Sequence, residues 1–331
     1  MPAPKLFMWT DGNAPVCSGT RGALINILKK CLIDGYGDKT PVGGWTVEFE
    51  NAESTIAVFR NNPLTGTGFF LKVNESTSAN AYTATINGYE LMTDIDAGIG
   101  LFQFNSDQNF PISNGANATA RPWVVIADDR AFHFHCHTGS SAAEIPINGS
   151  GARAFFFGDI IPINPSDAFA CLIARDSHTS GGAAQYVDKT ALNSCFLPSG
   201  TGEAPNNMCM PRGASGAPGA VSCCHGFGGG PASNYSGSSA YMYPQIFGAA
   251  GAPSLEPDPI FISRPYLSGQ TSFSVRGWTP GLYAPCHAVR FTPYSVLNES
   301  GKSFLVCATY GNSGTSAGYG QYLVSLDDWR A

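Results

Sequence analysis

One segment near the N-terminus carries hydrophobic residues at the period of an α-helix. It runs from Thr20 to Asp34, and most of its apolar positions follow the i, i+3, i+4, i+7 spacing that gathers them on one helix face. These positions are Leu24, Ile25, Ile27, Leu28, Cys31 and Leu32. Ser18 or Thr20 suits the N-cap, and Gly35 or Gly37 suits the end. The pattern predicts a helix over residues 20–34.

Most of the remaining chain has strand character, with alternating polarity or short apolar runs. The segments concerned are 45–49, 56–59, 69–73, 82–86, 89–92, 123–127, 131–137, 154–161 and 168–173, and the pattern resumes from Pro259. Asn87-Gly88 is typical of a tight hairpin turn, and Asp128-Asp129 with Arg130 predicts a second one.

These elements predict an α+β fold that is mainly antiparallel β, like a sandwich or barrel, with one short N-terminal helix. We expect the helix to pack on the first sheet. Its buried side chains and their expected partners are Leu24, Ile27, Leu28 and Cys31 against Trp45, Phe49 and Val58. The structural core should include Leu24, Leu28, Trp45 and Trp123.

The composition changes near Asp176 and divides the chain into three parts. Residues 1–175 carry the helix and most strands, and residues 254–331 carry strands that we expect to complete the β domain. Between them, residues 176–253 are rich in Gly, Ser, Ala, Pro and Asn. So long a segment without a core of its own is unusual in a compact domain. We interpret it as an extended arm or insertion ordered by neighbouring subunits; a surface excursion with a few short strands is the alternative.

The chain is also poor in charge. Asp, Glu, Lys and Arg make up 13% of its 331 residues, against about 25% in ordinary soluble domains. Interface cores are depleted in charge and enriched in aromatic residues, and aromatic residues reach 12% here. We therefore expect a homo-oligomer within a larger assembly, and a homotrimer is our first expectation. An extracellular β-sandwich would have a similar composition.

Charge and cysteine content restrict the partners and the place of synthesis. The net charge is −6 and the longest basic run is Lys29-Lys30, which argues against nucleic-acid binding. The first residues lack the apolar region of a signal peptide, and no apolar run is long enough for a membrane span. Ten cysteines without a secretion signal suggest free thiols made in a reducing compartment, with later oxidation in a released particle as an alternative.

The most distinctive local feature is the run Phe132-His133-Phe134-His135-Cys136-His137. In a strand, His133, His135 and His137 share one face and stand about 6–7 Å apart. A neighbouring pair is a candidate zinc site if an outside ligand completes it; on a three-fold axis, one histidine from each subunit would form a three-nitrogen site. The alternative, which we favour, is a polar face that is solvent-exposed or packed through hydrogen bonds.

No enzyme motif accompanies these histidines. The sequence has no G-x-S-x-G, no P-loop and no HExxH. Asp94, Asp96 and Asp107 lack the spacing of an EF-hand. Asp159 with His178 is a pair of the kind that any chain of this size offers. We predict no enzymatic activity and no cofactor.

Several spaced motifs resemble those of virion structural proteins of tailed bacteriophages. The first is the helix followed by Gly35-Tyr36-Gly37-Asp38-Lys39 and Gly44-Trp45-Thr46. Further motifs are GYELMTDID at 88–96, ARPW at 120–123 with ADDR at 127–130, FGDI at 157–160, and PGLY at 280–283. All of these motifs except PGLY lie within residues 15–175 and are spread over most of that range.

This resemblance implies a structural component of a tailed-phage particle, assembled in the host bacterial cytoplasm. A minor capsid or decoration protein in contact with the major capsid protein is the first expectation, and a tail or baseplate protein is the alternative. No catalytic residue carries over from the group. From another class, a surface-displayed β domain that binds glycan or metal through His133, His135 and His137 would also fit the sequence.

Overall fold

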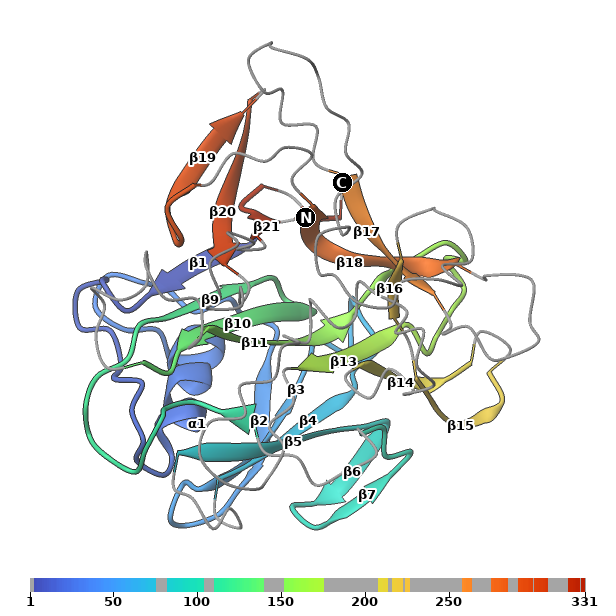
Figure 1. Ribbon diagram of the computed structural model, residues 1–331. Coiled ribbons are helices and arrows are strands. Elements are labelled where there is room, and N and C mark those ends of the chain that lie inside the picture. The colour runs from blue at the N-terminus through green and yellow to red at the C-terminus, as the bar shows by residue number, and fades with distance from the viewer. Residues whose placement is uncertain are drawn as a thin grey trace, which may run out of the picture.

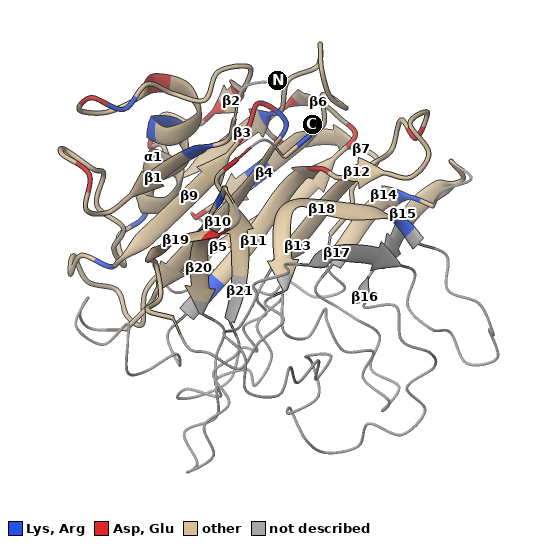
Figure 2. Ribbon diagram, turned by 90° about the horizontal axis from the view of Figure 1, so that it is seen from above, with Lys and Arg blue, Asp and Glu red and all other residues tan. Residues whose placement is uncertain are grey.

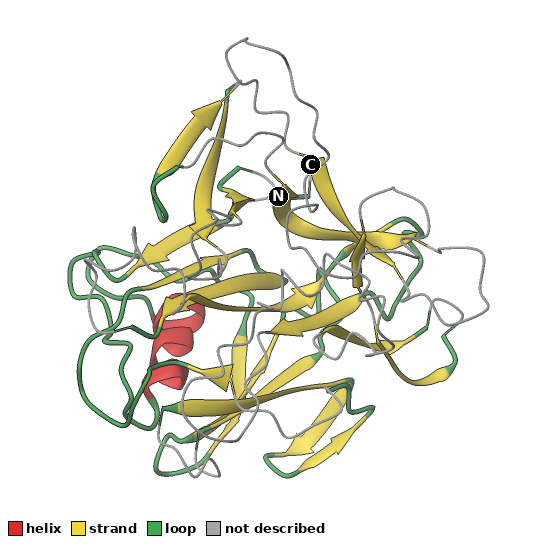
Figure 3. Ribbon diagram, viewed as in Figure 1, coloured by secondary structure: helices red, strands yellow, loops and turns green. Residues whose placement is uncertain are grey.

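The structure, a computed structural model, describes residues 3–75, 82–103, 110–139, 152–175, 208–213, 216–222, 224–226, 258–263, 275–284, 291–299, 301–308, 321–327 and 329–330. Over these residues the chain forms antiparallel sheets and one short N-terminal helix (Figure 3). The predicted fold class is confirmed.

A central sheet runs through the middle of the molecule (Figure 1). Its strand order is β1 (Lys5–Met8), β9 (Trp123–Ala127), β10 (Ala131–His137), β11 (Ala152–Asp159), β13 (Cys171–Arg175), β14 (Met208–Arg212) and β15 (Pro218–Ser222). The predicted turn at Asp128–Arg130 is confirmed, since it joins β9 to β10 and the Asp128 amide donates to the Ala131 carbonyl at 3.0 Å.

The N-terminal sheet lies on one side of the central sheet, with the helix beside it (Figure 1). Its strands are β2 (Thr46–Glu50), β3 (Ile56–Arg60), β4 (Phe70–Asn74), β5 (Thr83–Tyr89) and β8 (Phe110–Pro111). A two-stranded hairpin, β6 (Leu91–Asp94) and β7 (Ala97–Ile99), follows β5. Side chains of the helix, this sheet and the central sheet share one hydrophobic cluster.

The C-terminal sheet lies on the opposite side of the central sheet (Figure 1). It has the order β16 (Cys224–Gly226), β17 (Asp258–Ser263), β18 (Val275–Ala284), β21 (Gln321–Ser325), β20 (Lys302–Ala308) and β19 (Val296–Glu299), and β12 (Ile161–Pro162) pairs with β18. A second hydrophobic cluster joins it to the central sheet. The strands after residue 254 thus join β12 and β16 in a sheet that packs on the central sheet rather than extending it.

The helix is α1 (Ala23–Lys29), continued by a π-helical turn, η1 (Lys30–Asp34). It begins three residues later than predicted and ends as predicted before Gly35, whose φ is 79°. The predicted end at Gly35 is confirmed, whereas the predicted N-caps, Ser18 and Thr20, are wrong. Gly22 occupies the N-cap, and the Glu75 carboxylate accepts hydrogen bonds from the amides of Leu24 and Ile25.

The predicted partners of the helix are partly right. Leu24, Ile27, Leu28 and Cys31 are buried in the same cluster as Trp45 and Trp123. Phe49 and Val58, however, belong to a separate cluster with Phe70 and Met92. A bulge between Val47 and Phe49 shifts the register of β2, and in β3 it is Ala57 and Phe59 that face the helix side.

The predicted turn at Asn87-Gly88 is also wrong, because both residues lie inside β5, opposite Lys72 and Leu71. The glycine serves a different purpose there. A Cβ atom on Gly88 would lie 2.4 Å from the Phe102 ring, so a larger residue would displace that buried side chain.

Candidate functional site

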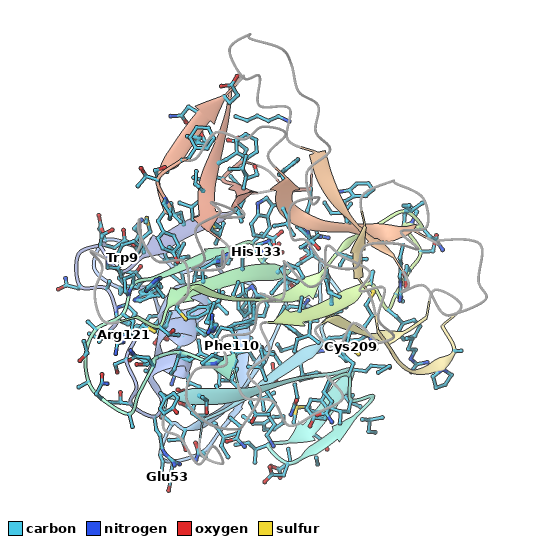
Figure 4. The ribbon with its side chains drawn as sticks, viewed as in Figure 1. Trp9, Glu53, Phe110, Arg121, His133 and Cys209 are labelled. Carbon is cyan, nitrogen blue, oxygen red and sulfur yellow. The ribbon has the colours of Figure 1, made fainter. Side chains whose placement is uncertain are left out.

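The three histidines of the distinctive motif lie on β10, in the middle of the central sheet between β9 and β11. Their side chains point toward the C-terminal sheet, while Phe132, Phe134 and Cys136 point into the cluster shared with the N-terminal sheet. Figure 4 labels His133 and Phe110 on the two sides of the central sheet. His133, His135 and His137, which we call the histidine face, are all at most 3% exposed.

His133 has the most completely defined surroundings. Its Nε2 lies 2.8 Å from the Pro280 carbonyl oxygen of β18, and because a carbonyl only accepts, the imidazole donates from Nε2. The ring centroid lies 4.8 Å from Phe156 and 5.4 Å from Trp329, which meets it edge-on at 90°. The His135 ring is stacked at 6.2 Å. The imidazole is therefore packed among aromatic rings.

This environment disfavours the charged imidazolium. Burial lowers the pKa of His133 from 6.5 to about 4, although the Pro280 hydrogen bond opposes the shift. Burial and the neighbouring His133 lower the pKa of His135 well below its usual value. Both side chains are neutral at neutral pH.

The geometry of His133 and His137 matches the packed, hydrogen-bonded interpretation, since His133 Nε2 meets the Pro280 carbonyl and His137 Nδ1 accepts from the Gly139 amide. Over the described residues, no group of three His, Cys, Asp or Glu side chains is placed to hold a metal ion. The Nε2 atom of His133 is occupied by the Pro280 carbonyl. A site on a three-fold axis would need histidines on an outer surface of the subunit, whereas these are enclosed within one chain.

The other sequence candidates are also placed in structural roles where they are described. Asp159 is buried, and its carboxylate accepts hydrogen bonds from Asn61 Nδ2 at 2.9 Å and from the Thr67 hydroxyl and amide at 2.6 and 2.8 Å. Burial raises its pKa above the ordinary range. Asp96 pairs with Lys72 at 2.7 Å. Asp107 and His178 lie outside the described residues.

Sequence reasoning missed a buried polar cluster near the C-terminus, which we call the polar node: Trp45, Asp128, Arg130, Asp159 and Arg330. The Trp45 indole donates to the Asp128 carbonyl at 2.8 Å, and the Asp159 amide donates to the Arg130 carbonyl at 3.1 Å. Arg330 donates to the Asp128 carboxylate at 2.6 Å and to the Asp159 carbonyl at 2.8 Å. Asp128 and Arg330 are 202 residues apart in sequence, so no local signal could have paired them.

A second feature missed from the sequence is an exposed apolar surface on the β6–β7 hairpin, the hairpin surface, formed by Leu91, Ile99 and Leu101. These side chains are 46%, 67% and 40% exposed. Leu91 and Ile99 face each other across the two strands. Met92 is buried on the opposite side against the N-terminal sheet.

Few positions of the described strands carry charge (Figure 2).

Comparisons with protein-family models and with curated proteins find no match to this chain. Among the described residues, no helix is both long enough and apolar enough to span a bilayer.

Proposed function

We propose that this chain is a structural subunit of a tailed-bacteriophage particle, without enzymatic activity. The assignment we prefer is a minor capsid or decoration protein that stabilises the shell through subunit contacts. The observation that carries the proposal is that its phage-like motifs, though far apart in sequence, contact one another inside the fold.

Three of these motifs meet in the polar node. Trp45 belongs to the GWT motif, Asp128 and Arg130 to ADDR, and Asp159 to FGDI. Backbone and side-chain hydrogen bonds join all three, with Arg330 between the last two. Residues that determine how sheets are joined are expected to recur in relatives that share a fold.

Two further motifs meet in the same way. The Tyr36 ring of the GYG turn lies 6.3 Å from the Trp123 ring of ARPW, edge to face. Gly37 has φ of 54°, and a Cβ atom there would lie 2.3 Å from the Gly12 carbonyl oxygen, so the glycine is required by this turn. These motifs are thus framework elements, as expected of a resemblance among structural proteins.

Assembly is supported by the surface and the composition. We assign the exposed apolar side chains of the hairpin surface to a subunit contact, and the low charge of the chain leaves it poorly suited to full solvation. We propose that the chain forms a homotrimer and contacts other virion proteins, such as the major capsid protein.

Copurification tests the virion assignment. Particles of the phage that encodes the chain are purified by density gradient and analysed by quantitative mass spectrometry. We expect the chain in a fixed stoichiometry to the major capsid protein; its absence from infectious particles would overturn the assignment. Antibody labelling in negative stain then distinguishes the capsid from the alternative location, the tail or baseplate.

A further inference from the structure

We propose that the histidine face is an acid-sensitive joint, at which protonation of His133 and His135 releases the C-terminal sheet from the central sheet. The inference concerns the isolated chain and holds whether or not the chain is a virion component.

The joint is small and specific. On the central sheet it consists of His133 and His135, and on the other side of Pro280, Gly281 and Trp329. His133 Nε2 bonds the Pro280 carbonyl, and the Trp329 ring meets the His133 ring edge-on. Trp329 lies so close to Gly281 that a Cβ atom there would approach its Nε1 to 2.2 Å. One imidazole therefore contacts both β18 and the C-terminal segment.

Around His133, no carboxylate of the described residues is placed to compensate a charge on the ring. β9 and β11 contribute Val124, Ile126, Ala154 and Phe156, and the C-terminal sheet contributes Leu282, Leu305, Cys307 and Val324. The titratable groups of this cluster are Cys307 and the adjoining Tyr294. Burial raises the pKa of Tyr294 well above its usual value. The Arg330 guanidinium, next to Trp329, is engaged by Asp128 and Asp159.

Protonation of the two histidines is therefore unfavourable while the C-terminal sheet is packed on the central sheet (the closed joint). It is unopposed once the sheets separate and water reaches the imidazoles (the open joint). Two imidazolium rings 6.2 Å apart would repel each other in an apolar setting. With a pKa of about 4 for His133 when closed, and about 6.5 when exposed to water, opening is favoured by roughly thirtyfold at pH 5 relative to pH 8. His135, whose pKa is also lowered, adds in the same direction.

Hydrogen exchange followed by mass spectrometry measures this opening in the purified full-length chain. Exchange is compared at pH 7.5 and pH 5.0, after correction for the intrinsic pH dependence of amide exchange. We expect protection in β18, β20 and β21 to fall by tenfold or more at pH 5.0, whereas β3 and β4 of the N-terminal sheet stay protected. Equal protection in β18, β20 and β21 at both pH values would overturn the proposal.

Substitution assigns the effect to the histidines. His133→Gln and His135→Gln keep a polar side chain of similar reach but cannot titrate, so each should reduce the acid response and the double variant should abolish it. His178→Gln, a histidine elsewhere in the chain, should retain the full response. An unchanged response in the double variant would overturn the proposal.

A titration of the unmodified protein covers the case in which the variants fail to fold. Imidazole proton resonances followed by NMR should show two histidines that titrate well below pH 6, together with the loss of protection in the C-terminal sheet. Histidines that all titrate near 6.5 while this sheet stays protected would refute the joint.

Discussion

At the scale of single residues, Glu75 is the least ordinary group in the described chain. It is fully buried at the start of α1, where its two carboxylate oxygens accept from the amides of Leu24 and Ile25 at 3.4 and 3.2 Å. These hydrogen bonds favour the carboxylate, but burial outweighs them and raises the pKa of Glu75 from 4.5 to about 7.

This shift predicts a pH dependence of stability. Between about pH 4.5 and 7 the folded state keeps a proton that the unfolded state has lost, so the free energy of unfolding falls as pH rises, by roughly 3 kcal/mol over the window. Glu75→Gln removes this slope. Urea unfolding of variant and parent at pH 4.5, 6 and 7.5 measures it, and the difference between the two cancels the opposite contribution of the histidines.

Exposed Glu53, which bonds Asn51 in a turn, provides the matched control, and Glu53→Gln should leave the pH profile unchanged. Parallel profiles for Glu75→Gln and the parent would show that Glu75 does not titrate in this window.

The sequence predicted apolar residues better than polar ones at this scale. Leu24, Leu28, Trp45 and Trp123 are buried as expected, because their burial follows from local period and side-chain size. The role of Glu75 at the start of the helix was not predictable, because Glu75 lies about 50 residues further along the chain. Polar residues next to the helix were the obvious candidates for its N-cap.

At the scale of elements, the hairpin surface should drive self-association. Leu91→Thr combined with Ile99→Thr places residues of high β propensity on β6 and β7 but removes the apolar cross-strand pair. Sedimentation velocity at rising concentration should show the variant shifted toward monomer. Its unfolding free energy should change by no more than about 0.5 kcal/mol per site, because both side chains are exposed.

Met92 on the buried side of β6 serves as the control for stability. Met92→Thr should destabilise the fold by about 2 kcal/mol or more. If the Leu91 and Ile99 variant associates as the parent does at every concentration, the hairpin surface plays no part in assembly.

The spacing of hydrophobic residues predicted whether a segment is helix or strand. It did not predict which elements pack against each other. The helical spacing over 20–34 located α1 and η1 to within three residues. The bulge in β2 reversed the expected side of Phe49, because one extra residue in a strand inverts every later side chain. The turn predicted at Asn87-Gly88 was wrong because Gly88 is needed inside β5, where the Phe102 ring leaves no room for a Cβ atom. No local sequence pattern indicates that contact.

At the scale of the whole molecule, the order of strands and the joining of sheets depend on contacts between distant segments. Alternation located β17, β20 and β21 but missed β19 and most of β18, and nothing local indicated a separate sheet across the histidine face. Arg330 is the clearest case, since it binds the β9–β10 turn from near the end of the chain.

The Arg330–Asp128 pair should therefore contribute strongly to stability. Both side chains are nearly buried, at 7% and 5% exposed, and the Nε–Oδ2 distance is 2.6 Å. Arg330→Met keeps the stem of the side chain but removes the guanidinium group, so the Asp128 carboxylate stays buried without its cation. Removing one partner of such a pair costs about 3 kcal/mol or more, which urea unfolding at pH 7 will detect.

A matched pair on the helix tests whether burial is the cause. Lys30 and Asp34 lie 3.1 Å apart but are 38% and 42% exposed, so Lys30→Met should cost no more than about 0.5 kcal/mol. Adding Asp128→Asn to Arg330→Met should recover part of the loss, because it removes the uncompensated charge while keeping an oxygen for the Arg130 and Ala131 amides. If Arg330→Met and Lys30→Met cost the same, the polar node does not hold the C-terminus to the central sheet.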